Sequence, residues 1–275
     1  MNQLLIEVAI KAALDAGARI MEIYESDDID VDLKSDNSPL TQADLTSHRI
    51  IKSYLTKTGI QVLSEEGRNI SFDERKNWEQ LWIVDPIDGT KEFINKNGEF
   101  TVNIALIEKQ RPALGVVYVP VLKELYFSTV DKGSYKVTSD IESFTSLEDL
   151  IANASSLPIK QPDRDFTVVA SRSHLSAETK AFIQSLEEKH GHVECISKGS
   201  SLKLCMVAEG RADCYPRFAP TMEWDTAAGQ AICNHAGISV IDWETKEEMT
   251  YNRKELLNNW FLVAHIGLFQ GLKIN

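Results

Sequence analysis

The beginning of the chain has apolar residues at the spacing of an amphipathic helix. Within residues 3–24 these positions are Leu4, Leu5, Val8, Ala12, Ile20 and Ile23. Their period predicts a helix with one buried face, in which Gly17 is the weakest position. A second helix is predicted to begin at Thr41, where Asp44 follows at the spacing of a capping box, and to end at Gly59.

The middle of the chain contains short apolar runs separated by turn residues. The runs occupy residues 61–64, 81–84, 102–107, 113–119 and 124–130, and a turn is expected at 131–134. Runs of this length, bounded by turn residues, are typical of strands. Because short turns join the successive strands from residue 102 onward, an antiparallel sheet is predicted there.

The last part of the chain alternates strands with helices. Strands are predicted at 166–170, 193–196, 212–215, 238–241 and near 261, and helices at 177–189, 201–208 and 225–235. Such alternation predicts helices layered on sheets. Residues 139–165 mix Ser, Asp and Pro around a short helical patch at 147–152. We therefore expect a single domain over 1–275, built from two halves at about 1–150 and about 160–275.

Composition and charge narrow the class of protein. Of the 275 residues, 43% are hydrophobic and 25% are charged, as in ordinary soluble proteins. The formal net charge of −12 disfavours binding to a nucleic-acid polymer. No apolar run reaches the roughly 18 residues that suggest a membrane span, and the N-terminus lacks the pattern of a secretory signal.

The cysteines give a prediction about compartment. No C-x-x-C pair occurs among Cys195, Cys205, Cys214 and Cys233. Reduced and mostly buried thiols are therefore expected, and with them a cytoplasmic protein. Peripheral association with the cytoplasmic face of an inner membrane stays open.

The strand at 81–84 leads into the sequence Asp85-Pro86-Ile87-Asp88-Gly89-Thr90. We expect the strand to end here, because Pro86 lacks an N–H donor and Gly89 permits backbone geometry that other residues avoid. A tight turn would direct both carboxylates and one carbonyl oxygen to the same point. Hard divalent cations such as Mg²⁺ prefer such oxygen ligands. On the other hand, aspartates are also common as plain turn and cap residues.

Further candidate positions lie elsewhere in the chain, and each has an ordinary structural alternative. Asp44 suits the first turn of a helix, and the adjacent Glu65 and Glu66 suit a solvated loop. Asp225, in Glu223-Trp224-Asp225-Thr226-Ala227-Ala228-Gly229, suits a helix cap. Residues 199–203, with the sequence Gly-Ser-Ser-Leu-Lys, provide hydroxyls, N–H groups and a cation at a helix start, which favours an anion.

These residues resemble a known family. The sequence Asp85-Pro86-Ile87-Asp88-Gly89-Thr90 resembles the signature of the inositol monophosphatase superfamily, whose members are magnesium-dependent, lithium-sensitive phosphatases. Residues 91–93 and 97–103 resemble its 3'(2'),5'-bisphosphate nucleotidase branch, and residues 223–229 resemble its W-D-x-A-A-G element. The resemblance extends from about residue 9 to about residue 261.

The resemblance implies a layered α/β (α+β) fold, a five-layer αβαβα sandwich with the site between its two halves. It implies two or three Mg²⁺ ions held by Glu65, Asp85, the Ile87 carbonyl, Asp88 and Asp225. It implies water attack catalysed by Asp44, Thr90 and Glu66, with Asp44 against Thr90. It implies substrate binding by Glu65, Asp88, Gly89, Thr90, Ser171, His174, Ser200, Lys203, Arg217 and Asp225.

The implied activity is hydrolysis of the 3'-phosphate of adenosine 3',5'-bisphosphate to AMP and phosphate, with the sulfated analogue as a further substrate. Lys203 and Arg217 would bind the phosphate that is not cleaved. One alternative is a sugar phosphatase of the same superfamily, which residues 91–93 and 199–203 disfavour. Another is a non-catalytic, metal-dependent nucleotide sensor, which would be expected to lack a ligand or a water-positioning residue.

Overall fold

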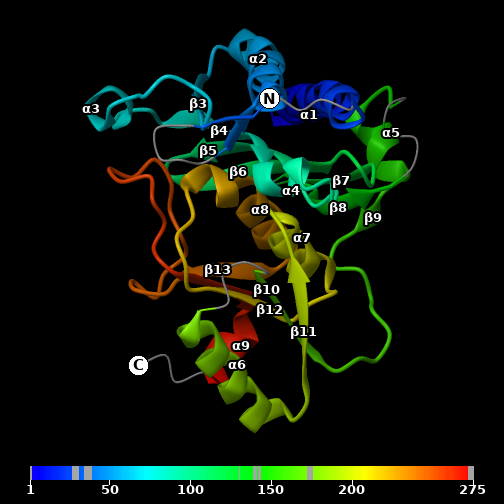
Figure 1. Ribbon diagram of the computed structural model, residues 1–275, viewed down its shortest axis with the longest axis vertical. Coiled ribbons are helices and arrows are strands. Elements are labelled where there is room, and N and C mark those ends of the chain that lie inside the picture. The colour runs from blue at the N-terminus through cyan, green and yellow to red at the C-terminus, as the bar shows by residue number, and fades with distance from the viewer. Residues whose placement is uncertain are drawn as a thin grey trace.

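The computed structural model describes residues 2–26, 31–33, 39–129, 131–138, 141, 144–171 and 176–271. Figure 1 shows five stacked layers: helices, a sheet, helices, a second sheet and helices. The two sheets have seven and five strands. This arrangement confirms the predicted five-layer αβαβα sandwich.

Two helices, α1 (Asn2–Tyr24) and α2 (Gln42–Leu55), form the first layer and confirm the sequence prediction. The N–H and the hydroxyl of Thr41 both donate to Asp44 Oδ2, at 2.8 and 2.5 Å, so the predicted capping pattern is present. Gly59 follows with a φ of +75°. The short elements around this layer are β1 (Val31–Leu33), β2 (Pro39–Thr41), η1 (Thr56–Thr58) and α3 (Phe72–Arg75).

The first sheet has the strand order β3-β4-β5-β6-β7-β8-β9. The strands are β3 (Gln61–Ser64), β4 (Gln80–Asp88), β5 (Thr101–Glu108), β6 (Arg111–Val119), β7 (Glu124–Thr129), β8 (Gly133–Val137) and β9 (Ser155–Ser156). Neighbours from β4 onward are antiparallel, as predicted for the strands after residue 102, whereas β3 and β4 are parallel. The turn expected at 131–134 is too long, because Gly133 already pairs with Thr129 in a tight hairpin.

The expectation that the strand ends at the signature turn is wrong. β4 pairs with β5 through Asp85↔Asn103 and again through Asp88↔Thr101, with a register shift between these two pairs. The strand therefore continues through a bulge that contains Pro86. A bulge leaves residues unpaired and so tolerates a proline that cannot donate to the ladder. Bulges also redirect side chains. Between Asp85 and Asp88 the side chains therefore do not follow the regular alternation between the two faces of the strand.

Two helices, α7 (Leu202–Glu209) and α8 (Glu223–His235), lie between the sheets. α8 contacts β4 to β8 on one side and β13 on the other. It packs tightly against the first sheet at Gly115 of β6, where a Cβ atom would lie 2.3 Å from the carbonyl oxygen of Ala228 and 2.8 Å from Cβ of Ala231. Small residues on both surfaces therefore set the distance between α8 and the sheet.

The second sheet has the order β11-β10-β12-β14-β13, with β10 parallel to β11 and β12, and β14 antiparallel to β12 and β13. Its strands are β10 (Phe166–Ser171), β11 (Val193–Lys198), β12 (Cys214–Arg217), β13 (Ile238–Asp242) and β14 (Phe261–His265). Helices α6 (Ala177–His190) and α9 (Ile266–Gly271) form the last layer. The remaining short helices are α4 (Thr90–Ile94) and α5 (Leu147–Ala152). The predicted division into halves at about residues 150–160 stays a prediction.

Apolar side chains fill the spaces between all five layers. Cys205, Cys214 and Cys233 are buried in these cores, Cys195 on β11 is exposed, and all four are free thiols, as expected from their spacing. Among the residues that the structure describes, no helix combines the length and apolar character needed to cross a membrane.

The close packing at Gly115 gives a test of this architecture. We expect Gly115→Ala to lower the free energy of unfolding by about 1–3 kcal/mol, the usual cost of overfilling a core, because its Cβ would overlap the Ala228 carbonyl. Urea denaturation measures this change. Gly267→Ala in α9 is the control, since its Cβ would meet only His265 ring atoms, at 3.4 Å or more. Equal stability of Gly115→Ala and the wild type would contradict the close packing.

Candidate active site

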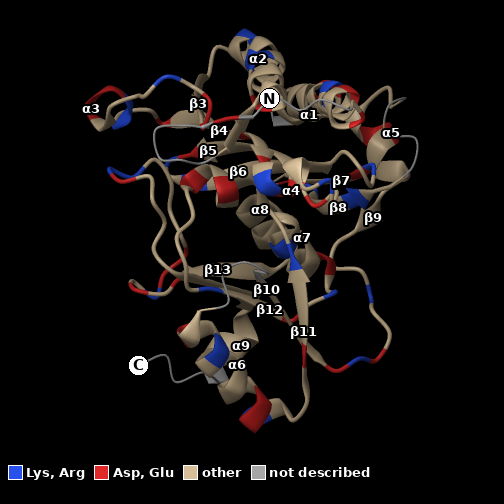
Figure 2. Cartoon of the chain, in the orientation of Figure 1, with Lys and Arg blue, Asp and Glu red and all other residues tan. Residues whose placement is uncertain are grey.

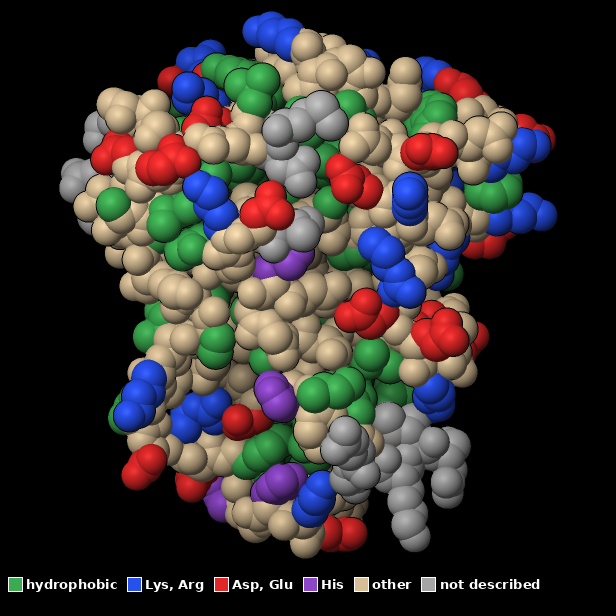
Figure 3. Space-filling view, turned by 180° about the vertical axis from the view of Figure 1, so that it is seen from behind, with side chains coloured by type: hydrophobic (Ala, Val, Ile, Leu, Met, Phe, Trp, Pro, Cys, Tyr) green, Lys and Arg blue, Asp and Glu red, His purple; other side chains and the backbone are tan. Residues whose placement is uncertain are grey.

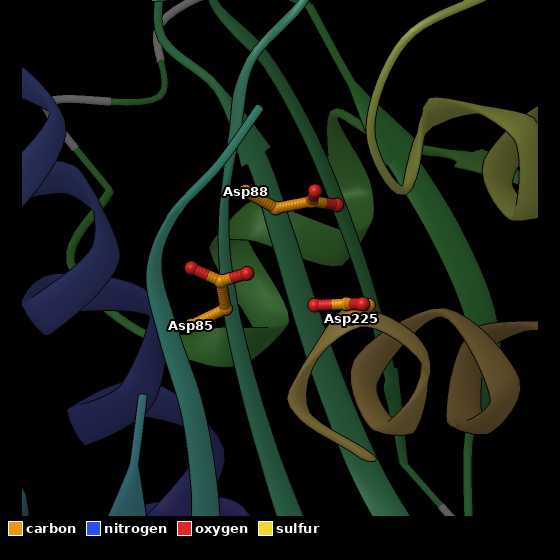
Figure 4. Close-up of side chains that lie close together, drawn as sticks. All are labelled: Asp85, Asp88 and Asp225. Atoms are coloured by element: carbon orange, nitrogen blue, oxygen red, sulfur yellow. The ribbon is translucent and has the colours of Figure 1, made fainter. Parts of the chain in front are cut away.

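Three carboxylates from two elements converge between the first sheet and the middle helices. Asp85 and Asp88 come from β4 and Asp225 comes from α8, and Figure 4 shows the three side chains directed toward one another. Each offers one oxygen within 4.8 Å of the others. Asp85 is only 1% exposed. The structure thus brings together three of the residues that the resemblance implies as metal ligands.

Local backbone contacts orient these carboxylates. Oδ1 of Asp85 accepts a hydrogen bond from the N–H of Ile87 at 3.0 Å within the bulge. Oδ2 of Asp225 accepts from the N–H of Met222 at 2.7 Å, which caps the start of α8. The cap interpretation and the ligand interpretation of Asp225 are therefore compatible, because a carboxylate can accept hydrogen bonds through one oxygen and offer the other.

Burial of these acids perturbs their titration. Burial first, and then the charges of Glu65, Asp88 and Asp225, raise the pKa of Asp85 well above its usual value. Burial and the charge of Asp88 raise the pKa of Asp225 to about 8. Clustered carboxylates repel one another and lose hydration, so a bound cation is the natural counter-charge.

The donor set fits a hard divalent cation. Asp85, Asp88 and Asp225 supply only carboxylate oxygens, which is the ligand type that Mg²⁺ and similar ions prefer. Glu65 follows β3 and is within hydrogen-bonding reach of Asp85, while Glu66 is half-buried next to it. The carbonyl of Ile87 lies 3.5 Å from the hydroxyl oxygen of Thr90. The ligand roles of Glu65 and Ile87 stay predictions.

A second polar group lies beside this cluster. Thr90, at the start of α4, donates from its hydroxyl to Oδ1 of Asp44 at 3.2 Å. Asp44 is 1% exposed, and Thr41 holds its other oxygen. The hydroxyl of Ser47 donates to the carbonyl of Pro86 at 2.8 Å and so fastens α2 to the bulge. Residues 46 positions apart therefore meet in the arrangement that the resemblance implies for Asp44 and Thr90.

Two residues at the cluster received no role from the sequence. The hydroxyl oxygen of Ser201 lies 2.7 Å from Asp88 Oδ2 and 2.7 Å from the carbonyl of Asp225, and it accepts from the side-chain amide of Asn103 at 2.9 Å. This contact joins a carboxylate of the first sheet to the start of α8. Both residues lie in segments that resemble the family, and this position could have marked them as candidates for the site. However, nothing in the sequence distinguishes Ser201 from the neighbouring Ser200.

A pocket of about 140 Å³ adjoins the cluster and contains several cations. Its lining includes Asp88, Gly89, Lys91, Lys198, Ser200, Lys203, Arg217 and Asp225. Figure 2 shows basic positions on α4, on α7 and at the end of β11, where the two sheets approach one another. These cations gather around one pocket of a chain whose net charge is −12, so the charge at the pocket is not given by the total charge of the chain.

The cations of the pocket are unevenly buried. Lys203 is 6% exposed, and this burial lowers its pKa to about 8. Its ammonium group donates to the carbonyl of Ser200 at 2.5 Å and to that of Lys198 at 3.3 Å. Arg217 donates from one Nη to the carbonyl of Pro220 at 2.8 Å. Arg217 Nε and Ser200 Oγ are both buried without a hydrogen-bond partner among the described residues, so they have unused capacity for a ligand.

Two of the predicted substrate-binding residues are not placed here. Ser171 ends β10, but its side chain lies outside the described residues, as does the whole of His174. Their roles stay predictions.

A buried network supports the start of α8. Glu223 is fully buried and accepts from the N–H groups of Asn252 and Arg253 at 2.7 and 3.0 Å. Arg75 of α3, 2% exposed, donates to the side-chain oxygen of Asn252 at 2.8 Å and to the carbonyl of Arg253 at 2.7 Å. The chain that follows Glu65 and Glu66 is thus fastened to the segment that holds Glu223, two residues before Asp225.

The raised pKa values predict how stability depends on pH. In metal-free protein the raised pKa of Asp225 stabilises the fold below the pKa of an unfolded aspartate, about 4, and this contribution is lost as the pH rises through about 8. We expect the Tm of the metal-free wild type to fall more between about pH 5 and pH 8.5 than that of Asp225→Asn. Scanning calorimetry measures both proteins.

Added Mg²⁺ should raise the Tm, and this gain should increase with pH, whereas the Tm of the metal-free protein falls with pH. Protons compete with the cation for the carboxylates, so the gain in Tm should be larger at about pH 8.5 than at about pH 5.5. Asp225→Asn is again the control and should show a smaller gain at the higher pH. A gain that does not depend on pH would contradict binding at these carboxylates.

Comparisons with known proteins agree with this geometry. The sequence profile of the inositol monophosphatase family matches residues 1–268. The 3'(2'),5'-bisphosphate nucleotidase CysQ of Escherichia coli (strain K12) is 42% identical over 263 residues, which cover 94% of this chain and 99% of that protein. The protein of the same name from Haemophilus influenzae is 34% identical and covers 94% of this chain and 91% of its own.

Solved structures give the same result. The crystal structure of CysQ from Bacteroides thetaiotaomicron, described as a bacterial member of the inositol monophosphatase family, has a TM-score of 0.88 and 50% identity over 96% of this chain and 97% of that chain. An inositol monophosphatase from Thermotoga maritima, at 22% identity and a TM-score of 0.74, shares the fold over 98% of this chain and 94% of its own. The resemblance predicted from the signature is confirmed: this chain belongs to the inositol monophosphatase family.

Proposed function

We propose that this protein is a magnesium-dependent phosphatase that hydrolyses the 3'-phosphate of adenosine 3',5'-bisphosphate to AMP and inorganic phosphate. The observation that carries the proposal is one pocket lined by Asp88 and Asp225 of the carboxylate cluster, which we call its acidic side, and by Lys203, Arg217 and Ser200, its basic side. A substrate with two phosphates can place one at each side. The nearly full-length similarity to proteins named bisphosphate nucleotidases supports the same substrate.

The acidic side is proposed to perform the chemistry. Asp85, Asp88 and Asp225, with Glu65 and the Ile87 carbonyl, would hold two or three Mg²⁺ ions. Such ions act as Lewis acids on phosphate oxygens and lower the pKa of a coordinated water. The remaining steps belong to residues of the chain, which bind the phosphate, orient the water and accept its proton.

Thr90 and Asp44 are proposed to orient the attacking water. Because the hydroxyl proton of Thr90 is directed to Asp44, the lone pairs of the Thr90 oxygen are available to accept a hydrogen bond from water. Water held in this way can direct a lone pair at the phosphorus, and Glu66 would support proton removal from the same side. The P–O bond to the ribose 3'-oxygen breaks as the bond from the water oxygen to phosphorus forms. The proton removed from the water returns through solvent to the ribose oxygen, which leaves as a hydroxyl.

The basic side is proposed to select the substrate. Arg217 can present a planar pair of N–H donors to a phosphate, and its Nε has no partner among the described residues. Lys203 adds a buried positive charge, and Ser200 adds a hydroxyl. Gly89 and Thr90 would offer backbone N–H groups to the phosphate that is cleaved, and Ser171 and His174 would contact the nucleotide.

A nucleic-acid polymer does not suit this arrangement. Figure 3 views the opposite face, on which the visible acidic and basic side chains are interspersed and do not form a broad basic area. The cations of the pocket are confined to a cavity of about 140 Å³. A small nucleotide is therefore the better ligand.

Phosphate release from a set of substrates tests the proposal directly. We expect the wild type to prefer adenosine 3',5'-bisphosphate over 3'-AMP, inositol monophosphate and fructose bisphosphate, to require Mg²⁺ and to be inhibited by lithium. A preference for inositol monophosphate would favour the sugar phosphatase. Binding of the bisphosphate without any turnover would favour the nucleotide sensor.

Arg217→Ala tests the selective role of the basic side. We expect a loss of roughly 2 to 4 kcal/mol in kcat/KM on adenosine 3',5'-bisphosphate, the scale of losing a charge-paired contact. Activity on 3'-AMP should hardly change, because that substrate has no second phosphate. Arg19→Ala in α1 is the control, since Arg19 is 57% exposed and outside the pocket. Equal losses on both substrates would exclude this role for Arg217.

A further inference from the structure

The segment 198–203 runs from the last residue of β11 to the second residue of α7 and lines the pocket; we call it the strap. It carries Ser200 and Lys203, which the proposed function uses, and Ser201, which contacts Asp88. Its geometry therefore decides where three polar groups lie relative to the carboxylate cluster. The contacts that hold the strap come from both halves of the fold.

Glu99 holds the strap from the first half. It lies between α4 and β5, and its side chain is 14% exposed. Oε2 of Glu99 accepts a hydrogen bond from the backbone N–H of Gly199 at 2.9 Å, and Oε1 lies 3.0 Å from Nζ of Lys198. One carboxylate thus fastens two successive residues of the strap.

The strap approaches Glu99 more closely than a side chain would permit. A Cβ atom at Gly199 would lie 2.8 Å from Cγ of Glu92 and 3.0 Å from the carbonyl oxygen of Glu99. A contact of 2.8 Å does not occur for real Cβ atoms unless the neighbour moves, and one of 3.0 Å is tighter than most. The absence of a side chain at Gly199 therefore permits the hydrogen bond to Glu99.

The attachment at Gly199 maintains an unusual backbone conformation at the next residue, Ser200. Ser200 has a φ of +45°, a left-handed conformation that non-glycine residues adopt at a cost of about 1 kcal/mol or more. Its carbonyl accepts from Lys203 at 2.5 Å, while its hydroxyl oxygen is buried without a partner among the described residues. Ser201, on the other side, is fixed to Asp88. Ser200 is thus held between two attached residues with its hydroxyl unused.

Glu99 is an acid beside a pocket that is proposed to bind anions, where its negative charge repels the substrate. Its presence there therefore needs an explanation. Here Lys198 offsets the charge of Glu99. We propose that Glu99 is a positioning residue that, through its hydrogen bond to Gly199, holds Ser200 and Lys203 where they bind the second phosphate of the substrate. This inference rests on the proposed function for the identity of that phosphate. The attachment of the strap itself does not depend on it.

Two substitutions separate the hydrogen bond from the charge. Glu99→Gln keeps an oxygen acceptor for Gly199 and removes the charge, whereas Glu99→Ala removes both. Glu178→Ala, at an exposed acid in the first turn of α6, is the matched control. Hydrogen–deuterium exchange of the peptide amides over 197–203 measures the strap. We expect faster exchange in Glu99→Ala than in the wild type, and no change in Glu99→Gln or Glu178→Ala.

Kinetics measure the effect on the substrate. For Glu99→Ala we expect KM on adenosine 3',5'-bisphosphate to rise about tenfold, the scale of losing a charge-assisted hydrogen bond, with kcat changed less than about twofold. KM on 3'-AMP should stay unchanged, because this substrate lacks the second phosphate and Ser201 keeps its own contacts with Asp88 and Asp225. A folding defect would instead lower the activity on both substrates.

Several results would overturn the proposal. Unchanged exchange in Glu99→Ala would show that Glu99 does not hold the strap. Equal increases in KM on both substrates would exclude a role in binding the second phosphate, and equal impairment of Glu99→Gln and Glu99→Ala would exclude the hydrogen bond to Gly199 as the decisive contact. A wild type that hydrolyses no bisphosphate would refute the proposed function, while the exchange comparison would still decide whether Glu99 holds the strap.

Discussion

The close approach of α8 to the first sheet is the constraint on which the site depends. Gly115 and the small residues Ala228 and Ala231 let the helix backbone lie against the strand, where a single added Cβ would meet a carbonyl oxygen at 2.3 Å. This packing brings Asp225 from one element within 4.8 Å of Asp85 and Asp88 from another. The site is therefore a consequence of packing between layers, because Asp225 at the start of α8 reaches the other two carboxylates only when the helix packs there.

This packing places like charges together, and the rest of the site reduces the resulting repulsion. Burial and neighbouring carboxylates raise the pKa values of Asp85 and Asp225, which means that the ionised cluster is unfavourable by itself. Ser201 and Asn103 supply hydrogen bonds around Asp88, and the N–H of Met222 supplies one to Asp225. A divalent cation bound to the carboxylates would remove most of the remaining repulsion, so metal binding and folding stability are linked.

Residues from the earlier and the later part of the sequence line one pocket and bring different charges to it. The Thr90–Asp44 contact and the carboxylates of β4 come from residues before about 150, whereas the cations Lys203 and Arg217 come from residues after about 160. Similarity to proteins named bisphosphate nucleotidases extends over nearly the whole chain, which agrees with a function that needs both halves. The strap at 198–203 connects these two sets of groups, because Ser201 contacts a carboxylate while Lys203 lies among the cations.

The sequence by itself determined what depends on neighbours along the chain. Periodicity predicted α1 and most of the longer strands, the capping pattern placed the start of α2, and the signature from Asp85 to Thr90 identified the family and its aspartates. Only the tertiary structure decided features that depend on distant residues. Pairing with β5 continued β4 through a bulge at Pro86, and side-chain packing chose Ser201 over its neighbour as the contact of Asp88. Local propensity carries no information about such partners, because their contacts form only when the layers pack.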